Sequence, residues 1–130
     1  MCPAWEEGSF LDCRGRGVTA EEILNKFPLP SHFYATLDGG AVPDKAALMG
    51  ALAAAFSFPA YFGKNWDALL DCLRTLPDEI PAKGYVLIIN NASAFLAGHP
   101  QDLAAFKDVA LEAATFLADK FKSDFTTILL

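Results

Sequence analysis

The sequence has few cysteines, and their spacing would not build a cross-linked or metal-binding framework. Its three cysteines, Cys2, Cys13 and Cys72, include no CxxC pair. An odd number without such spacing argues against a disulfide framework and a zinc site, so we expect no metal and free thiols in a reducing compartment. The sequence also lacks a Gly-rich phosphate loop, an HExxH motif and a nucleophile elbow. These absences disfavour an enzyme and indicate no cofactor.

Basic residues are in the minority, and long apolar runs are missing near the N-terminus. Ten Lys and Arg stand against 16 Asp and Glu, which gives a net charge of −6. Direct nucleic-acid binding needs basic patches, so this balance disfavours it and favours a basic protein partner. The opening residues, MCPAWEEGSFL, do not resemble a signal peptide, and no run near them approaches the ~20 residues of a membrane span. We therefore expect a cytoplasmic protein without membrane contact.

The sequence contains enough apolar residues for one ordinary domain. It has 130 residues, of which 53% are hydrophobic, so it can bury a stable core without disulfide bonds or a structural metal. We predict an N-terminal extension over residues 1–30, with a short strand and a short helix, and a main domain over residues 31–130. In the main domain the apolar patterns predict strands and helices in the order β-α-α-β-α-β. The expected elements are strand 32–37, helix 45–56, helix 66–76, strand 85–90, helix 101–121 and strand 125–130.

Strands separated by helices predict an α/β fold with a small, mostly parallel sheet and helices packed on it. We expect three strands from the main domain, and the N-terminal strand over residues 10–13 is a candidate fourth. Because the chain ends in a strand, one edge of the sheet would be exposed unless the N-terminal segment covers it.

The most informative stretch is residues 58–73, FPAYFGKNWDALLDCL. Asn65 is a good N-cap for a helix that starts at the next residue. In that helix Asp67 and Asp71 are four positions apart and share a face. Tyr61 precedes them in a loop with Gly63 in a tight connection. The apolar positions of the helix recur at i, i+3, i+4 and i+7 and predict a buried stripe on the other side: Trp66, Leu69, Leu70 and Leu73.

An aromatic side chain and two fixed carboxylates one helical turn apart can imitate the phosphates of a nucleic-acid strand. Such a face suits an enzyme that holds RNA phosphates with Arg, Lys and His. Simpler interpretations stay open. Asp67 and Asp71 can be an ordinary solvated helix face, Tyr61 can pack within its loop, and Asn65 can serve as a cap rather than a contact.

Residues 58–73 resemble the barstar family in an almost continuous pattern. The pattern consists of the aromatic pair 61–62, Gly63, Asn65 and a helix with Asp-Ala-Leu-x-Asp-Cys-Leu over residues 67–73. The resemblance covers about residues 31–130. It implies a barstar-like fold and an intracellular, monomeric inhibitor of a basic, secreted or toxin ribonuclease of the guanyl-specific type. It also implies that Asp67 and Asp71 are the central contacts, with Asp71 the stronger, and that Tyr61 packs on the partner.

The sequence departs from the family pattern at several positions. Lys64 stands where the family often has an acidic residue, Leu70 where it often has Trp, and Arg74 could partly neutralise Asp71. A further acidic contact of the family, late in the last helix, would fall on Leu117.

We take Asp119, two residues beyond Leu117, as the candidate for that acidic contact, with Glu112 also nearby. The departures keep two alternatives open. One is an immunity protein for a different nuclease toxin. The other is a protein-interaction module on the same fold that does not inhibit a nuclease.

Overall fold

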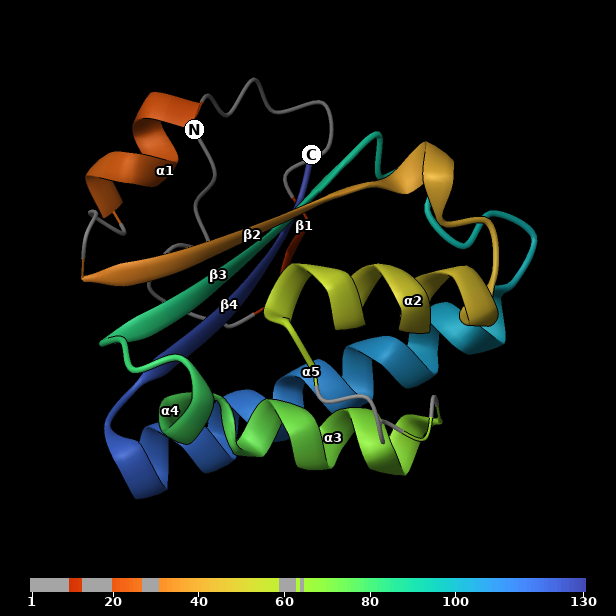
Figure 1. Ribbon diagram of the computed structural model, residues 1–130. Helices are drawn as coiled ribbons and strands as arrows, with labels where there is room; N and C mark the ends of the chain where they lie inside the picture. The colour runs from red at the N-terminus through yellow and green to blue at the C-terminus, as the bar shows by residue number, and fades with distance from the viewer. Residues whose placement is uncertain (1–9, 13–19, 27–30, 59–62, 64) are drawn as a thin grey trace.

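The computed structural model describes residues 10–12, 20–26, 31–58, 63 and 65–130. In these residues four parallel strands form one sheet in the order β1-β4-β3-β2 (Figure 1). The strands are β1 (Phe10–Asp12), β2 (His32–Asp38), β3 (Gly84–Asn90) and β4 (Asp124–Leu129). The helices are α1 (Ala20–Lys26), α2 (Lys45–Phe56), α3 (Trp66–Arg74), α4 (Leu76–Glu79) and α5 (Pro100–Phe121), with a 3₁₀ turn, η1 (Gly39–Ala41).

The α/β class and the parallel sheet are confirmed. The candidate N-terminal strand is the fourth strand, because β1 pairs with β4 and places Phe10 opposite Thr127. The edge that β4 would otherwise leave open is therefore paired from Thr127 to Leu129.

The sheet is covered on both faces, and this explains why the sequence of β3 is continuously apolar. Tyr85 and Leu87 point into the larger core, whereas Val86 between them points into a smaller cluster on the opposite face. A strand buried on both sides needs such a continuous apolar sequence. The smaller cluster is centred on Leu11, Ile23, Val86 and Ile128.

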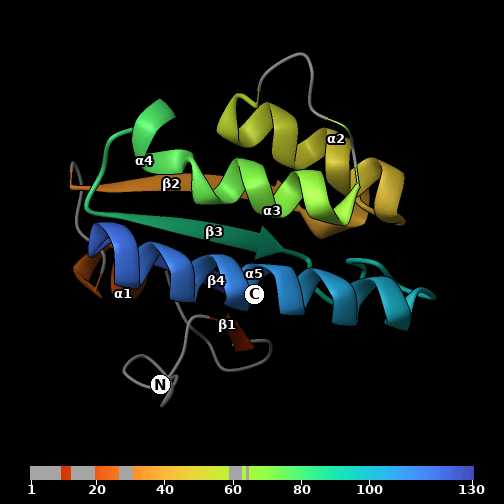
Figure 2. The ribbon, with the colours of Figure 1, turned by 90° about the horizontal axis from the view of Figure 1, so that it is seen from below.

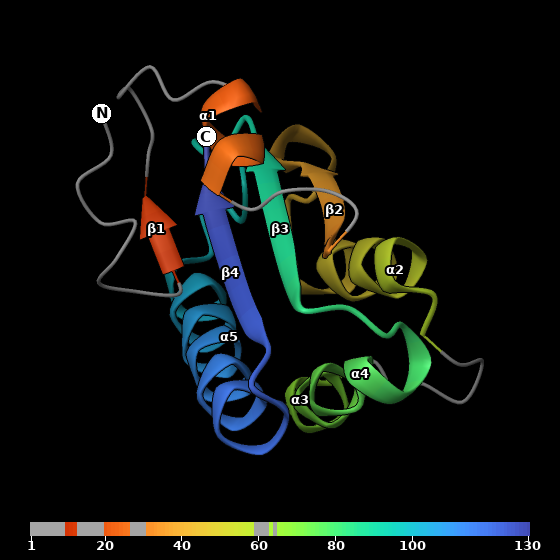
Figure 3. The ribbon, with the colours of Figure 1, turned by 90° about the vertical axis from the view of Figure 1, so that its left-hand side faces the viewer.

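The helices divide unequally between the two faces. α1 lies on one face, and α2, α3 and α5 lie on the other (Figure 3). Seen from below, α3 lies between α2 and α5 (Figure 2). The larger core fills the space between these three helices and the sheet, with Leu52 and Phe56 from α2 and Leu69 and Leu73 from α3. α3 packs mainly against α5, and it shares the larger core with α2.

The predicted helix over residues 66–76 is wrong at its C-terminal end. α3 stops at Arg74, and α4 starts separately at Leu76. Pro77 has no N–H for the carbonyl of Leu73, and its ring would clash with that carbonyl inside a continuous helix. The hydroxyl and the N–H of Thr75 bond to the Cys72 carbonyl instead, which closes α3 with a tighter turn.

Candidate functional site

The start of α3 is fixed by a side-chain cap. Asn65 Oδ1 accepts a hydrogen bond from the Ala68 N–H at 2.8 Å, and Asn65 Nδ2 donates to the Gly63 carbonyl at 3.4 Å. A Cβ at Gly63 would lie 3.3 Å from Asn65 Nδ2. The predicted cap is confirmed, and it ties the end of the adjoining loop to the first turn of α3.

The two aspartates of α3 lie on its exposed side. Asp67 and Asp71 are both exposed, and the side chain of Asp71 has a relative exposure of 77%. The residues behind them hold the helix in place, because Leu69 and Leu73 are fully buried. Because they are four positions apart, the Cα atoms of the two aspartates are offset by about 6 Å along the helix axis.

Only two of the four residues in the predicted apolar stripe are fully buried, Leu69 and Leu73. Leu70 and Trp66 are half-buried and pack against the edge of the core. Lys45 Nζ lies 5.3 Å from the centroid of the Trp66 ring, so part of this ring faces a cation rather than the core. The flank of α3 next to the aspartates is therefore partly apolar.

Asp67 and Asp71 form the acidic face of α3, and Arg74 connects this face to α5. Its Nη1 lies 3.9 Å from Asp71 Oδ1, and its Nη2 lies 3.8 Å from Glu112 Oε2. The guanidinium carbon also lies 5.2 Å from the centroid of the Phe116 ring. The sequence indicated partial neutralisation of Asp71. It offered Glu112 only as a neighbour of the late acidic position, not as a partner of Arg74, and it gave no sign of the aromatic ring. Residues four apart on a helix share a face, so Glu112 and Phe116 were recognisable as a pair but not as neighbours of α3.

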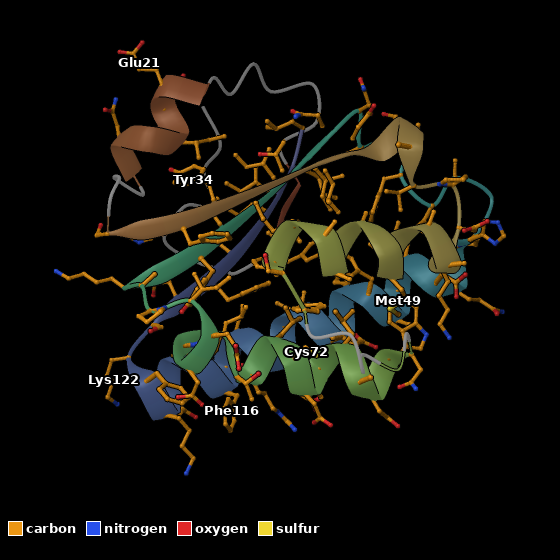
Figure 4. The ribbon with its side chains drawn as sticks, viewed as in Figure 1. Glu21, Tyr34, Met49, Cys72, Phe116 and Lys122 are labelled. Carbon is orange, nitrogen blue, oxygen red and sulfur yellow. The ribbon has the colours of Figure 1, made fainter. Side chains whose placement is uncertain are left out.

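A cavity of about 130 Å³ adjoins Asp71 where α2, α3 and α4 meet. Asp71 and Glu79 supply carboxylates to its wall. Cys72 also lines it, on the side of α3 that faces α2 (Figure 4). Burial, followed by the charges of Asp71 and Glu79, raises the pKa of the Cys72 thiol. A raised thiol pKa favours the neutral form, as expected for an inert cysteine rather than a nucleophile.

The late acidic position of the family falls on a buried side chain of α5. Leu117, where the count from the last strand placed it, is fully buried in the larger core. Asp119 is exposed in the last turn, about 10 Å beyond Glu112 along the axis. Its carbonyl accepts a hydrogen bond from Lys122 Nζ at 3.4 Å. Of the predicted residues, Gly63, Asn65, Asp67 and Asp71 come together at α3, whereas Asp119 lies further along α5. Tyr61, like Lys64, is outside the described residues.

Neither a metal cluster nor a membrane-spanning helix is found in the part of the chain that the structure describes. No three His, Cys, Asp or Glu residues there are placed to hold a metal ion. No helix among those same residues is long and apolar enough to cross a membrane.

The fold and the site together define a small parallel α/β protein that displays carboxylates on one helix of its larger helical face. The sequence model of the Barstar (barnase inhibitor) family matches residues 32–128, about three quarters of the chain. The chain therefore belongs to the Barstar family. Members of this family bind ribonucleases and are inhibitors rather than enzymes. A comparison with curated proteins gives no match.

Proposed function

We propose that this protein inhibits a ribonuclease by covering its active site with the exposed side of α3 and the loop before it. Asp67 and Asp71 take the places of two RNA phosphates, and Asp71 is the main anchor. The observation that carries the proposal is that one helix exposes both aspartates while Leu69 and Leu73, on its other side, are fully buried. Carboxylates fixed in this way bind cationic side chains with little loss of conformational entropy.

The charge of the molecule supports the same proposal. A net charge of −6 attracts a basic enzyme and accelerates encounter at low ionic strength. At the interface, Arg, Lys and protonated His of the enzyme would form charge-assisted hydrogen bonds with the two aspartates. Tyr61 would add a packing contact, Gly63 and Asn65 would hold the loop against α3, and Asp119 would be a peripheral contact.

We further propose a monomeric, cytoplasmic inhibitor of a guanyl-specific ribonuclease that acts outside the cell or as a toxin. Cys72, the cysteine within the described residues, is a free thiol, which suits a reducing compartment. An RNA-binding active site is lined with basic groups, so it offers the complementary charge for α3.

The test is a titration into a guanyl-specific microbial ribonuclease that cleaves a fluorogenic RNA, at two salt concentrations. We expect one-to-one inhibition that weakens as salt rises. Asp71→Ala should abolish it, and Asp67→Ala should weaken it. Asp108→Ala is the matched control, because Asp108 is an exposed carboxylate of α5 that the proposal does not place among the contacts.

Three outcomes would count against parts of this proposal. Full inhibition by both Asp67→Ala and Asp71→Ala would remove α3 from the interface. No inhibition at micromolar protein would shift the function to immunity against a different nuclease toxin. Capture of a cellular partner without nuclease activity would favour the interaction module.

A further inference from the structure

Arg74 lies between two carboxylates that belong to different helices. Asp71 is one turn before it on α3, and Glu112 reaches it from α5 at a nearly equal distance, 3.9 against 3.8 Å. A tight charge-assisted hydrogen bond is about 2.7–2.9 Å long, so neither pair is closed. One cation is shared, and the group of three keeps a net negative charge.

The surroundings of Arg74 favour its position on the α5 side. Its guanidinium lies over the Phe116 ring at 5.2 Å, in the range of a cation–π contact. Its side chain is 36% exposed, whereas that of Asp71 is 77% exposed. Arg74 Nε is buried and has no hydrogen-bond partner in the described part of the chain. The guanidinium therefore rests against α5, and Asp71 projects beyond it into solvent.

We infer that Glu112 is a positioning residue for the acidic face, an inference that rests on the proposed function. When a cationic side chain of the ribonuclease approaches Asp71, Arg74 competes for the same carboxylate and repels the incoming charge. Glu112 and Phe116 give Arg74 another place, so Asp71 is released to the partner. Without Glu112, Asp71 is the carboxylate that remains within ion-pair distance of Arg74 among the described residues.

The first measurement is the dissociation constant of the complex with a guanyl-specific microbial ribonuclease. Exposed ion pairs contribute about 0.2–1 kcal/mol, so we expect Glu112→Gln to weaken binding by a factor of about 1.4 to 5. Asp108→Asn is the matched control, because it removes one charge from an exposed position one turn earlier on the same helix. Equal effects of the two substitutions would overturn the inference, because both would then act only through the overall charge.

The second measurement asks whether Glu112 acts through Arg74. Arg74→Met keeps an unbranched apolar stem of similar width but removes the guanidinium and its charge, and it should tighten binding. In the Arg74→Met background, Glu112→Gln should weaken binding no more than Asp108→Asn does. A loss from Glu112→Gln that is the same in both backgrounds would overturn the inference, because Glu112 would then touch the ribonuclease itself.

Two controls separate this inference from the proposed function. In the free protein, a double-mutant cycle of Arg74→Met and Glu112→Gln in urea unfolding needs no partner. No coupling there overturns the inference and leaves the inhibitor proposal intact. In the complex, full binding by Asp71→Ala overturns the proposed site, and the role of Glu112 is refuted with it.

Discussion

Replacing the capping residue of α3 tests how the acidic face is held. Asn65→Ala removes the hydrogen bond from the Ala68 N–H, 2.8 Å long, and the weaker bond to the Gly63 carbonyl at 3.4 Å. Loss of an N-cap costs about 1 kcal/mol, and the longer bond adds little at an exposed position. For a domain of this size, that loss lowers the melting temperature by about 4 °C.

The assay is urea unfolding combined with ribonuclease inhibition, and Asn65→Asp is the informative control. Aspartate keeps a side-chain acceptor at the cap, and its charge is favourable at a helix N-terminus. We expect Asn65→Asp to keep both stability and inhibition, and Asn65→Ala to lose stability first. Unchanged stability of Asn65→Ala would refute the capping argument. Loss of inhibition by a fully stable Asn65→Asp would show that this side chain contacts the enzyme.

Three further predictions concern buried and hydrogen-bonded groups. Leu69→Ala, at a side chain with 0% exposure, should lower the free energy of unfolding by about 2–5 kcal/mol; a loss below 1 kcal/mol would contradict the orientation of α3. The hydrogen bond from Asn91, the largest cause, and that from the Gly40 N–H lower the pKa of Asp38, so Asn91→Ala should raise that pKa in a ¹³C titration. The stability from this group is present above its unfolded-state pKa and is lost as pH falls through the lowered folded value. Burial raises the pKa of the Cys72 thiol. In a variant that keeps Cys72 as its one cysteine, thiol modification at pH 7 should therefore be slower than that of glutathione. The stability from this group should be lost as pH rises through the pKa of the folded state.

The elements of the fold could be predicted from the sequence because each carries a local signal. Asp44 stands directly before the apolar pattern of α2 and caps it by accepting a hydrogen bond from the Ala47 N–H. The apolar run of β3 and the cap at Asn65 are equally local. The break of the helix at Thr75 was missed, although Pro77 carried the signal, because the apolar pattern continues through Leu76.

The environment of the acidic face could not be predicted, because it depends on distances between helices. The exposure of Asp67 and Asp71 follows from the helical period of α3 alone. The contact of Arg74 with Glu112 and Phe116 depends on how α3 packs beside α5. A sequence gives the faces of each helix, but it does not give the rotation of one helix against another.

The first strand and helix of the chain lie outside the match to the family, yet they take part in the sheet and its smaller core. β1 pairs with β4, and Ile23 of α1 is buried with Leu11, Val86 and Ile128. α1 lies on the face of the sheet opposite α3 (Figure 3). The described residues of α1 therefore cover apolar surface that Val86 and Ile128 would otherwise expose, while the acidic side of α3 stays open. Substitutions in this smaller core can therefore change stability without touching α3, because the sheet lies between them.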